Sequence, residues 1–318
     1  MGDALYIGSC SGTYYSFDRS TGEVLWSYDT GADGTAASFH GSPLITENLV
    51  ITGSDHSLGG HVFAFDRTTG EVVWEQDVGG LETDLIESGA HVIGGTSGGG
   101  LVALDTGTGE VVWTFSSESL EQRRGAFALT PAVDGDRVFY GGRDGRLYAL
   151  STATGDEIWV TELGGFVSTP TRLVDSQLYV GTYSNELIRL DPDSGEITAR
   201  LSTERSPHHA LVPAEAPGGK CLIVLLGRPE VTCVDTDLEG IRWSRSTDEE
   251  WTSYNPLVIG GVVVLGSAAG ELVAVRVEDG STAWSTELDG MLRGLGVSGG
   301  ILYVGTLAGT IYALELAP

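Results

Sequence analysis

Hydrophobic and polar residues alternate along most of the chain, in short runs separated by glycine-rich turns. Residues 62–66 show this alternation, a turn follows at Thr69 and Gly70, and residues 71–74 lead into Trp74. A period of two is typical of half-buried β-strands. No stretch has sustained helical periodicity, and 47 glycines against 10 prolines suit many short strands joined by tight turns. The pattern therefore predicts an all-β protein.

The strand–turn–strand unit that ends at Trp74 recurs along the chain. Its tryptophan position returns every 39 to 48 residues, with Ala199 replacing the tryptophan in one copy. This period is that of one four-stranded propeller blade. We expect these large flat side chains to fill the wedge between successive twisted sheets rather than to bind a ligand. The tryptophans with this structural, blade-docking role are Trp26, Trp74, Trp113, Trp159, Trp243 and Trp284.

The central hairpin of the repeat sets the expected number of blades. It occurs eight times, for example as residues 49–53 followed by residues 61–65, whereas the inner strand before it and the outer strand after it occur seven times each. We therefore predict one β-propeller domain over residues 1–318 with eight blades of four antiparallel strands. The first blade would lack its inner strand and the last its outer strand. Seven blades with a surplus hairpin are the alternative.

Two turn residues of the repeat carry specific expectations. The glycine that ends most second strands, such as Gly53, is expected to adopt positive φ in a tight turn. The aspartate that ends the third strand, such as Asp66, is expected to accept backbone N–H groups of the following turn.

The charge balance is strongly acidic. The chain has 44 acidic and 17 basic residues, a net charge of −27, and Lys220 is its only lysine. Self-repulsion of this size is tolerable when salt screens it. The acidic, lysine-poor composition resembles that of extreme halophiles, so we expect a halophilic, haloarchaeal protein with an acidic surface. An acidic protein of an ordinary cell is the alternative. Nucleic-acid binding is disfavoured because phosphate contacts need clustered lysine and arginine.

Cysteine placement and the absence of export signals bear on the compartment. Cys221 and Cys233 fall on the two strands of one hairpin. We expect buried free thiols there, with a cross-strand disulfide as the alternative. No apolar run approaches the length of a membrane span, and no leader is visible. The sequence as it stands therefore indicates a cytoplasmic protein, and an extracytoplasmic one if a leader has been truncated.

The motif Ala-x-Asp-x-x-Thr-Gly-x-x-x-Trp, clearest at residues 64–74 and 103–113, resembles the tryptophan-docking repeat of pyrroloquinoline-quinone (PQQ) propellers. That superfamily holds quinoprotein dehydrogenases and the BamB-like scaffold proteins of outer-membrane assembly. The resemblance extends over nearly the whole chain and implies the propeller fold. Because one fold serves many functions, the motif is less informative about activity.

The resemblance also allows the enzyme hypothesis to be weighed. Quinoprotein dehydrogenases carry a neighbouring cysteine pair, a cofactor-stacking tryptophan, calcium ligands and a catalytic aspartate. This chain has no adjacent cysteines, and it lacks the long insertions that build the cofactor chamber. Trp251 could stack on a quinone and Asp84 or Glu82 could act as a base. We nevertheless expect no catalytic residue, cofactor or metal, and keep a divergent oxidoreductase that uses PQQ with calcium as an alternative.

Propellers bind their ligands with the loops that lead into the inner strands. The histidine pair in these loops could hold a metal only outside a strand, because adjacent strand residues point to opposite sides. We expect a non-catalytic scaffold that binds a protein or peptide through its channel rim or an edge strand. A small-ligand sensor domain of a larger receptor or kinase is the alternative. The candidate rim residues are His40, Asp84, Arg124, Phe166, His208, His209, Trp251 and Arg293.

Overall fold

The computed structural model describes residues 4–30, 38–39, 41–55, 59–81, 83–117, 129–227, 230–246, 251 and 256–316. These residues form eight antiparallel sheets, six of four strands and two of three, and no helix. They are the blades of an eight-bladed β-propeller, so the predicted fold is confirmed and the seven-bladed alternative is wrong. The first sheet lacks an inner strand and the eighth lacks an outer one, as expected. Among the described residues there is no helix long and apolar enough to cross a membrane.

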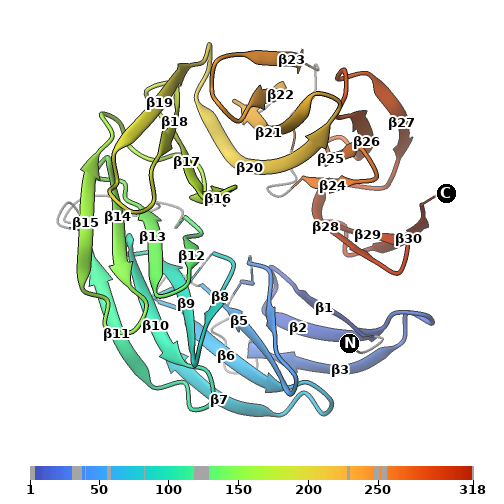
Figure 1. Cartoon of the computed structure of the whole chain (residues 1–318). Coiled ribbons are helices and arrows are strands. Elements are labelled where there is room, and N and C mark those ends of the chain that lie inside the picture. Colours follow the sequence, from blue (N-terminus) through green and yellow to red (C-terminus); the bar gives the residue numbers. More distant parts are fainter. Residues whose placement is uncertain are drawn as a thin grey trace. The chain divides into compact units, whose positions relative to one another are not determined.

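The chain divides into two compact units, Met1–Glu162 and Leu163–Pro318, and each contains four sheets. In the first unit the fourth strands β7, β11 and β15 follow one another along the same border (Figure 1). The strands of the first unit, sheet by sheet, are β1 (Ala4–Gly8), β2 (Thr13–Asp18) and β3 (Val24–Asp29); β4 (Leu44–Ile45), β5 (Leu49–Gly53), β6 (His61–Asp66) and β7 (Val72–Asp77); β8 (Ile86–Ser88), β9 (His91–Thr96), β10 (Gly100–Asp105) and β11 (Val111–Ser116); and β12 (Ala132–Asp134), β13 (Arg137–Gly141), β14 (Arg146–Ser151) and β15 (Glu157–Glu162).

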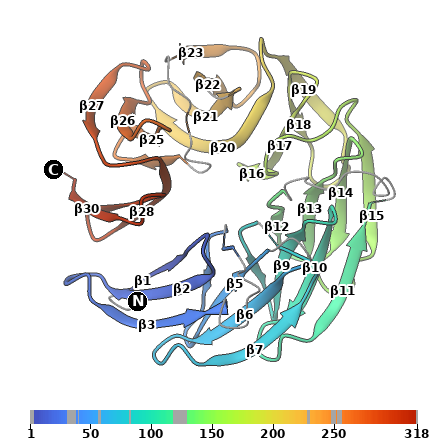
Figure 2. The same cartoon turned by 180° about the vertical axis from the view of Figure 1, so that it is seen from behind.

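The second unit repeats this arrangement and ends on a three-stranded sheet (Figure 2). Its strands are β16 (Arg172–Val174), β17 (Gln177–Thr182), β18 (Glu186–Leu190) and β19 (Ile197–Ser202); β20 (Pro207–Ala216), β21 (Gly219–Leu226), β22 (Glu230–Asp235) and β23 (Ile241–Ser246); β24 (Leu257–Ile259), β25 (Val262–Gly266), β26 (Glu271–Arg276) and β27 (Thr282–Glu287); and β28 (Leu292–Ser298), β29 (Ile301–Thr306) and β30 (Ile311–Glu315).

Within each unit, the core consists of apolar clusters enclosed between successive sheets. The second and third strands of the four-stranded sheets are mainly buried, whereas those of the three-stranded first and last sheets are more exposed. Between the first two sheets, for example, Tyr14 and Trp26 pack against Phe63 and Phe65, and all four are at most 8 % exposed. The Tyr14 and Phe65 rings are stacked, with their centroids 5.5 Å apart.

Four repeat tryptophans each join one sheet to the next one along the chain. The indole N–H of Trp26 donates to the carbonyl of Arg67 at 3.2 Å, and its ring lies on Gly70. A Cβ at Gly70 would lie 2.5 Å from Cδ2 of Trp26, so only glycine leaves room for the ring. Trp74 makes the same contacts with Thr106 and Gly109, Trp113 with Thr152 and Gly155, and Trp243 with Val277 and Gly280. These four tryptophans therefore make contacts between successive sheets.

Trp159 and Trp284 are half-buried. Trp159 has its ring centroid 5.8 Å from that of Phe139, and Trp284 packs against the apolar cluster of the last two sheets.

The aspartate of the repeat stabilises the turn on which the tryptophan docks. Oδ1 of Asp66 accepts the N–H groups of Thr68 and Thr69, at 2.9 and 2.8 Å, as expected. These bonds favour the charged carboxylate, so they hold the pKa of Asp66 below its ordinary value. The turn also needs Gly70, whose φ is +74°.

The glycines that end the second strands have a different role from the one predicted. Gly8, Gly53, Gly181 and Gly266 do not have positive φ. They are needed because the next part of the chain approaches closely: a Cβ at Gly53 would lie 2.4 Å from Cδ2 of Leu81. At these positions glycine permits packing rather than a turn.

Candidate functional site

Two of the predicted binding residues lie in the second unit beside an aromatic residue that the sequence analysis missed. Phe166 precedes β16, and its carbonyl accepts the N–H of Tyr183 at 2.9 Å. Tyr183 lies in the turn between β17 and β18, and its ring centroid is 5.9 Å from that of His208 at the start of β20. Phe166 and Tyr183 are each 47 % exposed. We call Phe166, Tyr183 and His208 the aromatic surface.

Hydrogen bonds tie together the segments that carry the aromatic surface. The Ser168 hydroxyl donates to the carbonyl of Pro207 at 2.6 Å. The Ser206 hydroxyl lies 3.3 Å from the carbonyl of Tyr183 and 2.8 Å from Oδ1 of Asn185. Gly165 lets its loop approach the turn, because a Cβ there would lie 2.2 Å from Oγ of Ser184. The segments that carry the exposed rings are therefore tied together.

Tyr183 carries a signal that sequence reasoning could have used. Turns favour small polar residues, and Ser184 and Asn185 follow this preference. A large aromatic residue at the start of such a turn gains little from the turn itself, which points to another role.

His208 and His209 both belong to β20, whose pairing with β21 is irregular between Pro207 and Leu211. Within the described ranges, no group of three histidine, cysteine, aspartate or glutamate side chains is arranged to hold a metal ion.

Asp84 and Arg293 lie on different units. Asp84 precedes β8, and its Oδ1 accepts the N–H of Ser42 at 2.7 Å, which fixes the start of the neighbouring inner strand β4. Gly41 reinforces this contact, because a Cβ there would lie 2.3 Å from the carbonyl oxygen of Thr83. Arg293 lies on β28 and is exposed. Asp84 therefore has a structural role that sequence reasoning did not anticipate.

Trp251 belongs to the core, contrary to the prediction that it lies on a binding rim. It is only 4 % exposed and packs in the cluster formed by the sixth and seventh sheets. Its backbone bridges to Ser267 beside β25. The segment was expected to be an exposed loop, but this pairing carries the indole inward, where it has no face to offer a ligand.

Two other predicted residues, His40 and Arg124, lie outside the described residues, as does the alternative base Glu82. The side chain of His209 is likewise not described.

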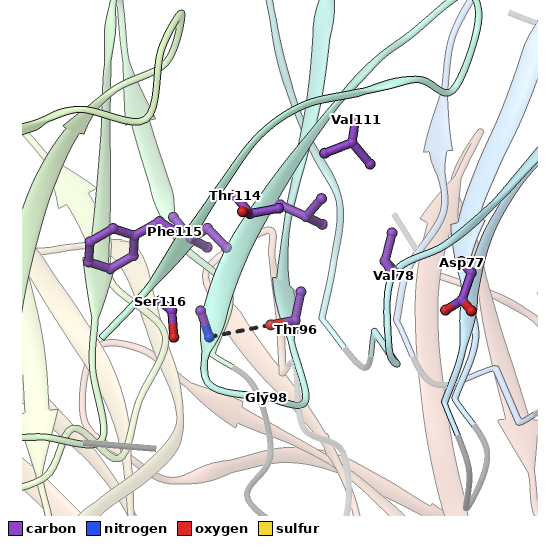
Figure 3. Close-up of a pocket in the computed structure, with 11 residues that line it drawn as sticks. Asp77, Val78, Thr96, Gly98, Val111, Thr114, Phe115 and Ser116 are labelled. Carbon is purple, nitrogen blue, oxygen red and sulfur yellow. Dashed lines mark hydrogen bonds between the residues drawn. The ribbon is translucent and has the colours of Figure 1, made fainter. Parts of the chain in front are cut away.

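An open depression of about 380 Å³ lies in the first unit between the end of β7 and the outer strand β11. Val78, Val111 and Phe115 supply apolar walls (Figure 3). Its acidic residue, Asp77, accepts the N–H of Gly79 at 3.0 Å. The depression offers apolar contact area and hydroxyl groups, but its lining holds no pair of groups suited to acid–base chemistry.

A disulfide joins Cys221 to Cys233 in the sixth sheet, so the prediction of free thiols is wrong and its alternative is correct. The two Cα atoms are 5.9 Å apart, within the usual range. The bridge is diagonal, because Cys221 pairs with Asp235 and Cys233 pairs with Ile223 across the strands. Both cysteines are fully buried, whereas Cys10 is a free, exposed thiol.

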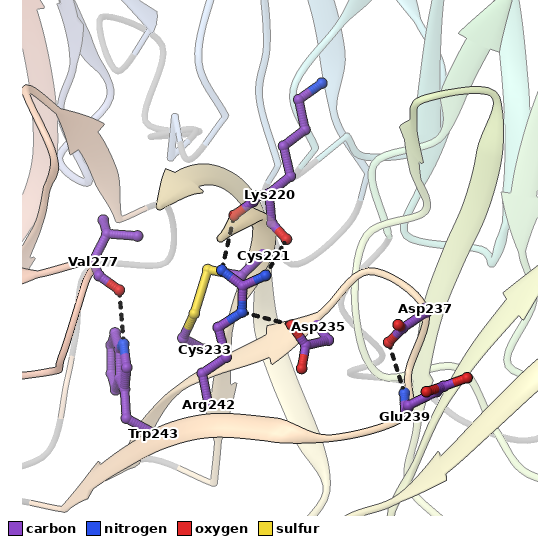
Figure 4. A network of polar contacts seen from close by, with 10 residues as sticks. Lys220, Cys221, Cys233, Asp235, Asp237, Glu239, Arg242, Trp243 and Val277 are labelled. Carbon is purple, nitrogen blue, oxygen red and sulfur yellow. Dashed lines mark hydrogen bonds and ion pairs between the residues drawn. A yellow bond between two sulfur atoms is a disulfide. The ribbon is translucent and has the colours of Figure 1, made fainter. Parts of the chain in front are cut away.

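Arg242 supports the same sheet from its outer strand β23 (Figure 4). Its Nε donates to Oδ1 of Asp235 at 2.6 Å, and its terminal nitrogens donate to the carbonyls of Gly219 and Lys220, at 2.8 and 3.0 Å. The Arg242 guanidinium thus joins three of the four strands of this sheet.

Two of the residues considered for a PQQ–calcium site are engaged in the fold itself. Trp251, the residue proposed to stack on the quinone, is buried in the core. Asp84, one residue proposed as the base, is engaged by a backbone amide.

Comparison with known proteins places the chain among propellers of this type. The model of the family described as outer membrane protein assembly factor BamB matches residues 1–197 and 186–317. The crystal structure of BamB from Moraxella catarrhalis has a TM-score of 0.79 at 22 % identity, covering 98 % of this chain and 94 % of that one. No curated protein sequence matches.

Other solved structures with different descriptions share the fold. The computationally designed Ika8 protein has a TM-score of 0.78 at 16 % identity, covering 99 % of this chain and 94 % of that one. A europium-containing methanol dehydrogenase has a TM-score of 0.69 at 13 % identity, covering 96 % and 80 %. At these identities the likeness establishes the fold alone.

Proposed function

The chain belongs to the family described as outer membrane protein assembly factor BamB, and on this premise we propose that it is a non-catalytic scaffold that binds a protein or peptide partner. The aromatic surface is the observation that carries the proposal. Large aromatic residues supply much of the binding energy at protein interfaces. Here two of them are each 47 % exposed, on loops already tied together by hydrogen bonds. Such a surface binds without a large cost of ordering.

The roles of Asp84 and Trp251 support a scaffold over an oxidoreductase. An enzyme keeps its catalytic base and stacking group accessible to substrate and cofactor. In this chain the aspartate holds the backbone of a neighbouring sheet, and the indole fills the core. Replacing either residue would disturb blade packing rather than remove a reacting group.

The disulfide supports an extracytoplasmic location. Disulfides persist in oxidising compartments and are rare in the reducing cytoplasm. The Cys221–Cys233 bridge therefore favours the extracytoplasmic alternative over the cytoplasmic one suggested by the sequence.

Affinity capture from an extract of the source organism in molar KCl tests the function. The baits are the wild type, the double variant Phe166→Ser/Tyr183→Ser, and Leu307→Ser as a control. Leu307 is 50 % exposed in the same unit, so this control also removes an exposed apolar side chain.

We expect one protein to be retained by the wild type and the control. After purification, that protein should bind the double variant at least tenfold more weakly. Equal binding to all three baits, or no specific partner, would refute a role of the aromatic surface in partner binding.

A further inference from the structure

Aromatic pairs fill two of the three wedges between successive sheets of the first unit. Tyr28 and Phe115 each lie two residues after the tryptophan of a fourth strand, in β3 and β11. The Tyr28 ring centroid is 5.6 Å from that of Phe63 in the second sheet, and the Phe115 ring centroid is 4.9 Å from that of Tyr148 in the fourth sheet. Phe63 and Tyr148 are also equivalent, because each precedes the alanine that pairs with the next tryptophan.

The wedge between the second and third sheets lacks this aromatic pair. The equivalent residues there are Gln76 and Val102. Nε2 of Gln76 donates to the carbonyl of the adjacent Asp77 at 3.2 Å. Val102 lines the open depression of about 380 Å³ between β7 and β11, and Gln76 is not among the described residues that line it (Figure 3). The depression therefore lies where the neighbouring wedges hold a ring.

The depression has an apolar base formed by the third sheet. Leu101 and Val102 are 1 and 3 % exposed, and Val111 at the side is 44 % exposed. Thr114 lies on the same face of the sheet as Val102, because the two residues pair directly across β10 and β11. A ring that entered here would cover apolar surface, as the Tyr28 and Phe115 rings do in the neighbouring wedges.

The part of the chain that forms the depression carries acidic residues without basic ones. Residues 68–122, which include β7 and the whole third sheet, contain ten acidic residues and no lysine or arginine. Asp77 lines the depression and is exposed, and so are Glu75 on β7 and Glu110 immediately before β11. Such a concentration of one charge attracts cationic groups and repels anionic ones.

We propose that this depression binds an extended segment of a partner polypeptide in which an aromatic residue lies between basic residues. The aromatic ring enters the depression over Val102 and supplies the side chain that the repeat itself provides in the neighbouring wedges. The flanking arginine or lysine side chains face the exposed carboxylates of Asp77 and Glu110. The acidic surroundings disfavour an anionic occupant such as a nucleic acid or an anionic lipid surface.

The inference rests on the proposed role as a scaffold for polypeptides, but it uses a different surface. The aromatic surface belongs to the second unit, and the depression belongs to the first. A variant that changes one site leaves the residues of the other unchanged, so the two hypotheses can fail separately.

A short peptide, acetyl-Gly-Arg-Tyr-Arg-Gly-amide, is the probe. Its tyrosine is replaced by 3-fluorotyrosine so that fluorine NMR reports on the ring. A second peptide carries alanine in place of the tyrosine, and a third carries glutamate in place of both arginines. A fluorescent label on all three allows anisotropy measurements. Titrations are run in molar KCl, where the screening length is about 3 Å, and again at roughly a third of that concentration.

Three protein variants separate docking in the depression from general effects. Gln76→Tyr restores the aromatic residue of the neighbouring wedges and should fill the depression. Ser27→Tyr is the matched control, because Ser27 is also exposed on a fourth strand of the first unit but does not line the depression. Asp77→Asn removes one charge and keeps an oxygen that can accept the N–H of Gly79.

We expect the wild type and Ser27→Tyr to bind the tyrosine peptide saturably, with a shift of the fluorine signal. Binding should be at least tenfold weaker for the alanine peptide, for the glutamate peptide and for Gln76→Tyr. Asp77→Asn should bind about threefold more weakly, and its loss should be larger at the lower KCl concentration. The Phe166→Ser/Tyr183→Ser variant should bind the peptide as the wild type does, whatever its effect on other partners.

Three results would overturn the proposal. The first is the absence of saturable binding up to millimolar peptide, and the second is equal binding of the tyrosine and glutamate peptides. The third is equal binding to the wild type and Gln76→Tyr. If Gln76→Tyr does not fold, equal binding to the wild type and Asp77→Asn at both KCl concentrations would overturn the proposal instead.

Discussion

The docking of each tryptophan on a glycine makes a sharp prediction for two identical substitutions in one chain. Gly70→Ala and Gly22→Ala change the same position of the same turn, and both glycines have a φ of +74°. An alanine in this left-handed conformation costs roughly 1–2 kcal/mol in either turn. This common cost cancels when the two variants are compared, and what remains is the cost of displacing the indole from Gly70.

The structure sets the size of that remainder. A Cβ at Gly70 would lie 2.5 Å from Cδ2 of Trp26, so the ring must move. The move exposes part of a side chain that is 8 % exposed and breaks its 3.2 Å hydrogen bond to Arg67. Complete removal of a buried aromatic ring costs about 3–5 kcal/mol, and a hydrogen bond contributes about 1 kcal/mol. Because the ring shifts but is not deleted, we expect Gly70→Ala to be less stable than Gly22→Ala by about 2–4 kcal/mol.

Urea unfolding at constant molar KCl, followed by tryptophan fluorescence, measures this difference. Both glycines belong to the first unit, so the two variants report on the same structural unit. The midpoints are comparable only if the dependence of unfolding free energy on urea is unchanged. A difference below about 0.5 kcal/mol would refute the docking geometry, because the clash at Gly70 would then cost almost nothing.

Further predictions concern the core, the charge, the disulfide and acid stability. Trp113→Ala should destabilise by about 3–5 kcal/mol in urea unfolding, since Trp113 is 7 % exposed; a loss under about 1 kcal/mol would contradict its assignment. The net charge of −27 should make the thermal midpoint rise between 0.1 M and molar KCl, and an unchanged midpoint would refute salt adaptation. Replacing Cys221 and Cys233 by alanine should cost about 3 kcal/mol, the loop entropy for a separation of 12 residues, and a thiol assay of the denatured wild type should find only Cys10. The hydroxyl and amide of Ser20 and the amide of Thr21 lower the pKa of Asp18 to about 2. Its stabilising effect is thus complete above the ordinary value near 3.8 and lost as the pH falls toward 2, so the acid limb of a stability–pH curve should be shallower for Asp18→Asn, and an unchanged limb would contradict this.

The fold could be predicted because each blade repeats the same physical solution. The alternation of apolar residues defines the strands, and one tryptophan and one glycine per repeat define how a sheet meets its neighbour. These signals are local or recur at a fixed period, so they are visible without knowledge of distant contacts. The role of Gly53 was mistaken because its reason is a distant one: Leu81 occupies the space that a side chain would need.

The candidate site was less predictable because its residues owe their positions to contacts between segments. Trp251 lies outside the repeat register and reads as part of an exposed connection, but a backbone bridge to Ser267 buries it. The cysteines could not be assigned from register alone, since Cys221 directly faces Asp235 and its bond to Cys233 runs diagonally. Tyr183 was missed because its partners Phe166 and His208 come from two other segments of the chain, a loop and the start of β20.

The repeat that looks most degraded in the sequence has retained its packing. In the fifth sheet Ala199 replaces the docking tryptophan, and in the sixth sheet the turn after Asp235 has its glycine one position late, at Gly240. The structure shows that these two changes compensate. Because the fifth sheet provides no indole, this turn does not need a glycine to leave room for one. Leu238, with a φ of +62°, fills the space instead. Its side chain is 4 % exposed and packs in the cluster that Ala199 contacts.

This compensation separates two kinds of departure from the repeat. Ala199 and Leu238 depart together and keep the core filled, so packing alone explains them. Packing does not explain an exposed Tyr183 on a short turn. Residues that a fold does not need are the ones available for recognition. For that reason we assign partner binding to the aromatic surface rather than to the tryptophans that dominate the sequence.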